Sequence, residues 1–123
     1  MKKKLKKKVI FCFDLDNVIC LTTKSNYQLS KPNIKAINLI NKLYSKGHHI
    51  KIFTARYMGR NNDDIIKARK QGEKMTKAQL IKWNVKFTKL IMGKPSYDIF
   101  VDDKAYGFKK NWINNFEKKY LNV

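Results

Sequence analysis

Residues 9–13 of this chain form an uninterrupted apolar run, Val-Ile-Phe-Cys-Phe, which ends at Asp14 and Asp16. A run this short, rich in β-branched and aromatic residues, is typical of a strand that is covered on both faces. Strands of this kind belong to parallel sheets, whose neighbouring strands are joined by helices. The run therefore favours an α/β fold with a parallel sheet.

The rest of the chain alternates between strand-like and helix-like segments. Further strands are predicted at residues 49–54, 88–92 and 98–102, and helices between Ser30 and Gly47 and at residues 61–72, 76–83 and 105–120. Ser30 is expected to cap the first helix and Gly47 to end it, while Thr76 is expected to cap the third. This alternation predicts a Rossmann-like three-layer αβα fold with a central parallel sheet in the strand order 3-2-1-4.

The net charge is strongly positive, because 28 Lys and Arg residues stand against nine Asp and Glu residues, a sum of +19. Only three of the bases are Arg, the residue best suited to bidentate phosphate or base contacts. The pattern favours a solvated surface, and nucleic acid held on the basic surface is the less favoured partner. The run from Lys2 to Lys8 repels itself, so residues 1–8 are predicted to be a flexible basic N-terminus and residues 9–123 a single domain.

The apolar run is too short for the hydrophobic region of a signal peptide, and no segment approaches the roughly 18 apolar residues of a membrane span. Cys12 and Cys20 have no spacing typical of a metal site. We therefore expect a cytoplasmic protein with reduced cysteines and no membrane partner.

The scarce acidic residues carry the functional information. Four of the nine form two pairs, Asp14 with Asp16 and Asp102 with Asp103, and each pair follows a predicted strand. Ligands of open parallel sheets bind outside the carboxyl ends of the strands. Two carboxylate pairs that converge there would make an oxygen-rich pocket, which is the environment that Mg²⁺ requires.

The two remaining strands also end in polar groups. Thr54 ends the strand at 49–54, and Lys94 follows the strand at 88–92. A carboxylate nucleophile, a metal, a hydroxyl, an ammonium group and a second carboxylate are together the parts of a phosphoryl-transfer site. The sequence therefore predicts phosphoryl-transfer chemistry at the carboxyl ends of four strands.

Between about Val9 and Tyr106 the chain resembles the haloacid dehalogenase-like (HAD) hydrolase superfamily. Its four motifs occur in order as Phe-Asp-Leu-Asp at 13–16, Thr54 in Ile-Phe-Thr-Ala-Arg, Lys94 in Gly-Lys-Pro-Ser-Tyr-Asp, and Asp102-Asp103 in Phe-Val-Asp-Asp-Lys. Within the superfamily, the local sequence is similar to that of small phosphatases of sugar-nucleotide and surface-polysaccharide biosynthesis. The intervals of 37 residues before Thr54 and 39 after it hold no cap domain, so the resemblance implies an open active site. The segment at 20–30 or a second copy of the chain would cover it.

The resemblance implies a role for each acid. Asp14 would be the nucleophile, would form an aspartyl-phosphate and would bind Mg²⁺. Asp16 would protonate the leaving alcohol and then activate water, and its backbone carbonyl would contribute to the metal. Asp102, together with Asp103, would complete the Mg²⁺ site.

Four further residues would hold the substrate. The resemblance implies that Thr54 and the backbone of Ala55 bind the phosphate, and that Lys94 neutralises charge on the nucleophile and the phosphate. Arg56 is expected near the mouth of the pocket, as a contact to the rest of the substrate or as a surface side chain. The chain departs from the motif at Asn17, where a turn needs a residue that tolerates a positive φ, which Asn does.

These residues predict a Mg²⁺-dependent phosphomonoesterase that acts on a small phosphorylated metabolite, a sugar phosphate or a related biosynthetic intermediate. Two alternatives remain at this stage. One is a phosphatase of polynucleotide ends, which would suit an open site on a basic surface. The other is a weakly active or regulatory module that binds phosphate, which the departures at Asn17 and Val18 leave open.

Overall fold

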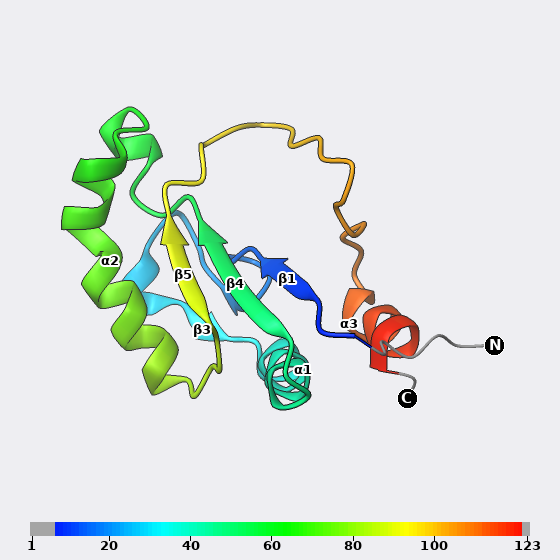
Figure 1. Ribbon diagram of the computed structural model, residues 1–123. Helices are drawn as coiled ribbons and strands as arrows, with labels where there is room; N and C mark the ends of the chain where they lie inside the picture. Colours follow the sequence, from blue (N-terminus) through cyan, green and yellow to red (C-terminus); the bar gives the residue numbers. More distant parts are fainter. Residues whose placement is uncertain (1–6, 122–123) are drawn as a thin grey trace.

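The computed structural model describes residues 7–121 and shows a mixed α/β fold (Figure 1). Three strands form a parallel sheet in the order β1-β4-β5, with bounds Ile10–Phe13, His49–Thr54 and Lys89–Met92. Residues 1–6, most of the predicted flexible N-terminus, lie outside the described residues. No helix of the described part is long and apolar enough to cross a membrane.

Helices connect and flank the strands. They are α1 at Ile34–Ser45, α2 at Ile65–Lys82 and α3 at Trp112–Phe116, which continues as a π-helical turn at Glu117–Leu121. Between β1 and α1 lie the short antiparallel strands β2, Cys20–Leu21, and β3, Lys31–Pro32, on either side of the 3₁₀ turn Tyr27–Leu29. A second 3₁₀ turn, Gly59–Asn61, precedes α2.

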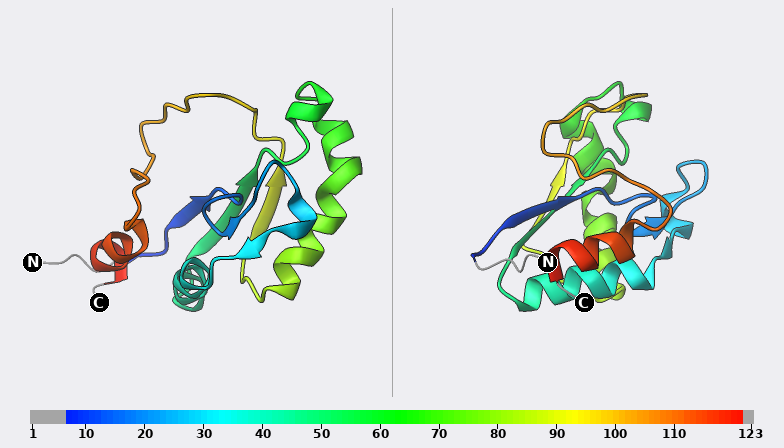
Figure 2. Two further views of the ribbon diagram at one scale, coloured as in Figure 1. Left: turned by 180° about the vertical axis from the view of Figure 1, so that it is seen from behind. Right: turned by 90° about the vertical axis from the view of Figure 1, so that its right-hand side faces the viewer.

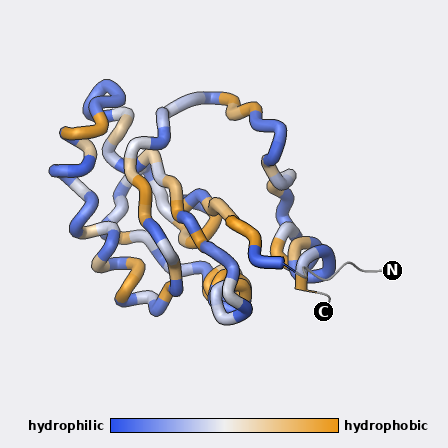
Figure 3. Tube along the Cα trace, in the orientation of Figure 1, coloured by the Kyte–Doolittle hydropathy of each residue, from blue (hydrophilic) through white to orange (hydrophobic). Residues whose placement is uncertain are grey.

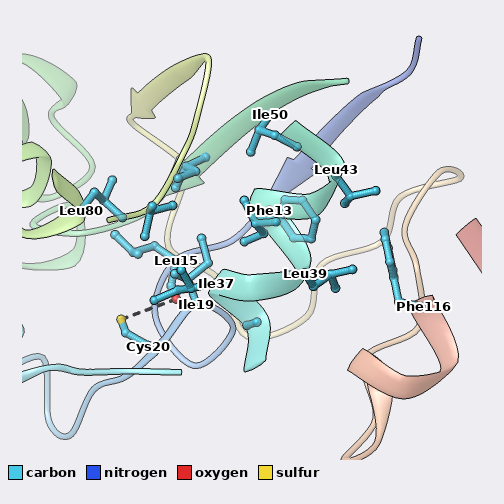
Figure 4. Close-up of a cluster of buried hydrophobic side chains, with 14 of the residues drawn as sticks. Phe13, Leu15, Ile19, Cys20, Ile37, Leu39, Leu43, Ile50, Leu80 and Phe116 are labelled. Atoms are coloured by element: carbon cyan, nitrogen blue, oxygen red, sulfur yellow. Dashed lines mark hydrogen bonds between the residues drawn. The ribbon is translucent and has the colours of Figure 1, made fainter. Parts of the chain in front are cut away.

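The helices cover one face of the sheet, so the expected three layers are wrong for the described residues. In β1 Phe13 is buried, whereas Ile10 and Cys12 are exposed, and alternate strand residues point to opposite faces. Figure 2 shows the helices on one side of the sheet. One core cluster joins buried residues of β1 and β4 to side chains of α1, α2 and α3 (Figure 4). The crossovers from β1 to β4 and from β4 to β5 run in the same direction, and right-handed crossovers then place α1 and α2 on one face.

The predicted fourth strand is absent, which leaves the expected order 3-2-1-4 unconfirmed. Residues 98–102 belong instead to an arc that leaves the sheet after β5 and returns to α3 (Figure 1). Asp102 accepts a hydrogen bond from its neighbour Lys104 through the backbone N–H at 2.8 Å, and such local bonds compete with ladder pairing. Without this strand there is no crossover to the other face, so the third layer is missing too.

The arc carries apolar side chains that have little cover. Ile99 and Val101 are 82% and 89% exposed, and Figure 3 shows the hydrophobic stretch within the arc. The outer edge of β1 has no strand partner among the described residues. The arc and this edge are therefore the part of the fold with the most exposed apolar side chains and unpaired backbone.

Helix α2 replaces the two helices that were predicted at 61–72 and 76–83. Gly72 lies within this helix, and its lack of a side chain leaves room for the ring of Tyr57: an added Cβ would lie 1.9 Å from Tyr57 Cε2. Thr76 is a buried residue of the helix interior and not a cap. The cap of α2 is Asp64, whose side chain accepts from the N–H of Lys67 at 3.1 Å and places a negative charge at the positive end of the helix dipole.

Helix α1 begins later than expected. Asn33 caps it by accepting from the N–H of Ala36 at 3.2 Å, so the prediction of Ser30 as the cap is wrong. Lys31 and Pro32 are drawn into β3, and the Ser30 hydroxyl is bonded elsewhere. The end of the helix is as predicted, since Gly47 has a φ of +90° and donates to a carbonyl of the last turn at 2.9 Å.

Candidate active site

The ends of the three strands bring three of the predicted residues together. Asp14 follows β1, Thr54 ends β4, and Lys94 follows β5 after Gly93. The backbone N–H of Lys94 donates to the carbonyl of Thr54 at 3.1 Å, which extends the ladder past the end of β5. Lys94 Nζ lies 3.6 Å from Asp14 Oδ2. The parallel register thus places a carboxylate and an ammonium group at one edge of the sheet.

This pair lines a cavity of about 700 Å³. Its lining residues include Asp14, Ala55 and Lys94 from the prediction, and Asn17, Ser25, Tyr27, Gly59, Arg60, Pro95, Ser96 and Tyr97 in addition. Ser25 and Tyr27 belong to the segment at 20–30, which was one of the two predicted covers. The volume is in the range of sites for small organic ligands.

The ionisation of the pair depends on burial and on mutual charge. Burial raises the pKa of Asp14, while the positive charge of Lys94 and the N–H of Leu15, 2.9 Å from Oδ1, oppose that rise. Burial lowers the pKa of Lys94, but its hydrogen bond to Tyr97 and the charge of Asp14 outweigh this and raise that pKa overall. Lys94 is therefore a stable cation beside the candidate nucleophile.

Asp16 does not line this cavity, contrary to its expected place beside the leaving group. Its Oδ1 accepts from Arg56 Nη2 at 2.9 Å, and its Oδ2 accepts from Arg56 Nε at 3.0 Å. Thr22 Oγ1 donates to Asp16 Oδ1 at 2.5 Å. Donors from Arg56 and Thr22 thus occupy both oxygens of the Asp16 carboxylate.

Arg56 is a buried side chain, so its prediction as a residue at the pocket mouth is wrong. Its side chain is fully inaccessible to solvent. Beyond Asp16, its Nη1 donates to Gln79 Oε1 at 2.7 Å, and its guanidinium carbon lies 4.9 Å from the ring centre of Tyr27. A buried guanidinium needs such partners because burying an unpaired charge is costly. Asp16 and Gln79 of helix α2 together stabilise the guanidinium of Arg56 in this buried position.

Thr54 is buried, and its hydroxyl accepts from the N–H of Arg56 at 3.1 Å. It lies at the end of β4 as expected but is not among the lining residues of the cavity, whereas its neighbour Ala55 is. In this position the Thr54 hydroxyl shapes the turn after β4. Ala55 is the predicted phosphate-binding residue that borders the cavity.

The predicted metal ligands are not assembled. Asp102 and Asp103 are exposed residues of the arc and do not line the cavity. Within residues 7–121, no three or more His, Cys, Asp or Glu side chains are grouped as a metal site. The physical reason is the missing strand at 98–102, which alone would have carried these acids to the edge where Asp14 lies.

One local prediction is confirmed in detail. Asn17 has a φ of +67° and donates its N–H to the carbonyl of Cys20 at 2.6 Å, which closes the turn after Asp16. Its tolerance of the left-handed region lets this turn form without glycine. The two cysteines are unpaired, as expected.

Sequence reasoning missed the aromatic and basic wall of the cavity. Tyr27, Arg60 and Tyr97 come from three separate segments and have no shared spacing, so no sequence pattern marks them. The scarcity of Arg was the available signal, because one of the three Arg residues, Arg60, lines this cavity, and a second, Arg56, is buried against Asp16.

The fold and the cavity define an α/β protein with a ligand-sized site at the carboxyl ends of parallel strands. No family model and no curated protein matches the chain. Among solved structures, it is similar to a crystal structure of an MCSG target from Vibrio cholerae, with a TM-score of 0.74 and 24% identity over 91% of this chain and 98% of that one. At this identity the likeness shows the fold alone.

Proposed function

We propose that this chain is a Mg²⁺-dependent phosphomonoesterase, a capless member of the HAD superfamily, that acts on a small phosphorylated metabolite such as a sugar phosphate. The observation that carries the proposal is the 3.6 Å contact between Asp14 Oδ2 and Lys94 Nζ at the wall of a cavity of about 700 Å³. A carboxylate nucleophile needs an adjacent cation if a phosphate dianion is to approach it.

In the proposed reaction a carboxylate oxygen of Asp14 attacks the phosphorus, and the bond from phosphorus to the ester oxygen breaks. The leaving alcohol takes up a proton, and an aspartyl-phosphate remains. Water then attacks that phosphorus, the bond to Asp14 breaks, and inorganic phosphate is released with the carboxylate restored. Throughout, Lys94 neutralises charge on the phosphoryl oxygens, and its burial strengthens this interaction.

Mg²⁺ would supply further neutralisation of the phosphoryl oxygens. Asp14 fits as a ligand, because it offers a hard carboxylate oxygen at the cavity wall, and Mg²⁺ sites use one or two carboxylates together with water and substrate phosphate. Asp102 and Asp103 also have carboxylates suited to Mg²⁺, but both residues lie in the arc and away from the cavity wall. In the proposal they join Asp14 when residues 98–102 pair with the free edge of β1.

Asp16 would transfer protons only in an arrangement in which its carboxylate leaves Arg56 and turns to the cavity. The hydrogen bonds from Arg56 and Thr22 oppose this turn. Asp14 and Lys94 therefore carry the first bond-making step, and proton transfer by Asp16 depends on a side-chain rearrangement.

The test is hydrolysis of p-nitrophenyl phosphate by the purified chain with Mg²⁺, followed by a screen of phosphorylated sugars for released phosphate. We expect EDTA to abolish turnover, and Asp14→Asn to lower the turnover rate by on the order of a thousandfold or more. Glu73→Gln is the control, because Glu73 is an acid of α2 that lies outside the cavity and pairs only with Arg69, at 3.4 Å, among the described residues. Turnover that survives Asp14→Asn in metal-free buffer would overturn the proposal.

A further inference from the structure

Arg60 lies four residues from Arg56 but has no acidic partner. Its Nη2 donates to the backbone carbonyl of Ser25 at 3.1 Å, and no carboxylate lies within 4.0 Å of it among the described residues. It is exposed, whereas Arg56 is enclosed. A guanidinium carries five N–H donors, so most of the donors of Arg60 are available to a ligand.

The guanidinium of Arg60 rests on an aromatic platform formed by Tyr27 and Tyr57. Its central carbon lies 4.7 Å from the ring centre of Tyr57 and 5.3 Å from that of Tyr27, and the two ring centres are 4.8 Å apart. Stacking orients the plane of a guanidinium and leaves its edge free for bidentate bonds to an oxyanion.

The platform is anchored to helix α2. Tyr57 is buried at a φ of +67°, with its ring against Gly72, and Asn61 Nδ2 donates to its carbonyl at 2.7 Å. Gln79 Nε2 donates to the carbonyl of Tyr27 at 2.8 Å. A residue held at a positive φ by packing is a strained feature that the surrounding structure must maintain. The two tyrosines on which Arg60 rests are therefore held in place by packing and hydrogen bonds.

Arg60 also stands between two cavities. It lines the cavity of Asp14 and Lys94, and it lines a neighbouring cavity of about 770 Å³ that includes Tyr27, Tyr57 and Lys24. None of the residues that line the second cavity is acidic. A ligand anchored at Asp14 and Lys94 can thus extend towards a region whose charged groups are all positive.

We propose that Arg60, supported by Tyr27 and Tyr57, binds a second anionic group of the substrate, a phosphate or a carboxylate, while the phosphoryl group to be removed lies at Asp14 and Lys94. This inference rests on the proposed function and narrows its substrate class to small phosphate monoesters that carry a second oxyanion. Arg60 binds a part of the substrate that does not react, so it acts mainly through KM.

The test compares two substrates that differ in one group, 3-phosphoglycerate with a carboxylate and glycerol 3-phosphate with a hydroxymethyl group. We expect the wild type to favour the carboxylate by about tenfold to a hundredfold in kcat/KM, the range of a charged hydrogen bond. Arg60→Gln should bring the ratio of the two substrates close to one through KM, and Arg60→Lys should restore part of it.

Arg69→Gln is the matched control. Arg69 is an exposed Arg of α2 that pairs with Glu73 at 3.4 Å and lines neither cavity, so its loss should leave the substrate ratio as in the wild type. A wild-type ratio near one, or a ratio that Arg60→Gln does not change, would overturn the inference while phosphatase activity stands. A stronger preference for an oligonucleotide 3′-phosphate that falls steeply with salt would also overturn it, in favour of polynucleotide ends.

Binding measurements test the Arg60 subsite independently of the proposed phosphatase activity. Calorimetry with Asp14→Asn measures the affinity for the same two compounds when neither is turned over, and Asp14→Asn with Arg60→Gln gives the comparison. Tighter binding of 3-phosphoglycerate that is lost with Arg60→Gln supports the subsite even if the wild type releases no phosphate, a result that would refute only the proposed function. Equal affinities for both compounds would refute the subsite.

Discussion

The candidate site has two halves, and they are built in different ways. Asp14, Thr54 and Lys94 lie at the ends of paired strands, whose register sets the separation of the three residues. Asp102 and Asp103 lie in an arc held mainly by local hydrogen bonds, with apolar neighbours left exposed. Parallel pairing fixes a strand end relative to its neighbours, whereas an arc has no such constraint. The half on the strands is assembled without a ligand, and the half in the arc is not.

The half of the site on the strands is also connected to the protein interior through Arg56. Substitution of Arg56 should have the largest effect on stability. Arg56→Met leaves Asp16 without its buried partner, so we expect the free energy of unfolding to fall by about 3–5 kcal/mol. Urea denaturation followed by circular dichroism measures it. Arg69→Met, on the surface, should change it by about 0.5 kcal/mol or less. A loss below about 1 kcal/mol for Arg56→Met would mean that the buried pair does not hold this half together.

The next effect concerns catalysis by the assembled half. Lys94→Met should lower kcat/KM for p-nitrophenyl phosphate by about a hundredfold to a thousandfold, because the charge beside Asp14 is lost. Lys104→Met removes an exposed Lys of the arc and should have little effect. Similar losses from both variants would contradict the division into two halves.

A smaller effect tests the unassembled half. If the arc delivers Asp102 to the end of β1 when Mg²⁺ binds, Asp102→Asn should raise the Mg²⁺ concentration for half-maximal activity by about tenfold and leave stability almost unchanged. Titration of activity with Mg²⁺ measures the first, and urea denaturation the second. Asp98→Asn, another acid of the arc, is the control. An unchanged Mg²⁺ requirement for Asp102→Asn would show that the arc remains outside the site.

The smallest effect lies at the opposite end of β1. His48 Nδ1 accepts from the N–H of Val9 at 3.1 Å, and burial, aided by the charges of Lys8 and Lys46, lowers the pKa of His48. The unfolded chain therefore binds this proton more readily, and stability is lost as the pH falls below about 6.5.

The expected loss in the free energy of unfolding is about 1 kcal/mol, the net worth of one hydrogen bond. It is measured by urea denaturation on either side of pH 6.5, in the wild type and in His48→Gln, which should show less of this dependence. His49→Gln, at the exposed neighbouring position, should behave as the wild type. A pH dependence that persists in His48→Gln would exclude His48 as its origin.

Local signals in the sequence were good guides to local structure. The strand predicted at 49–54 has these bounds in the structure, Gly47 ends α1 as predicted, and Asn17 adopts the left-handed turn expected of it. Each of these depends on a few neighbouring residues. The strand at 98–102 has an equally favourable composition but does not form, because a strand needs a partner as well as a suitable sequence.

The arginines show what local signals leave undetermined. Arg56 and Arg60 share one short segment after β4, yet one is buried against Asp16 and Gln79 and the other stands exposed over two tyrosines. Apart from Tyr57, which lies in the same segment, their partners come from the turn after β1, from residues 25–27 and from α2. No spacing within residues 54–61 distinguishes the two roles.

The sequence alone is enough to predict which residues end the three paired strands, because in each of them an apolar run stops at or just before a polar residue. It therefore placed Asp14, Thr54 and Lys94 at one edge of a parallel sheet. Which side chains meet beyond that edge depends on the tertiary structure. It turned Asp16 towards Arg56, left Asp102 in the arc and set Arg60 on its platform, because such contacts join segments far apart in the chain and depend on how completely the sheet is covered.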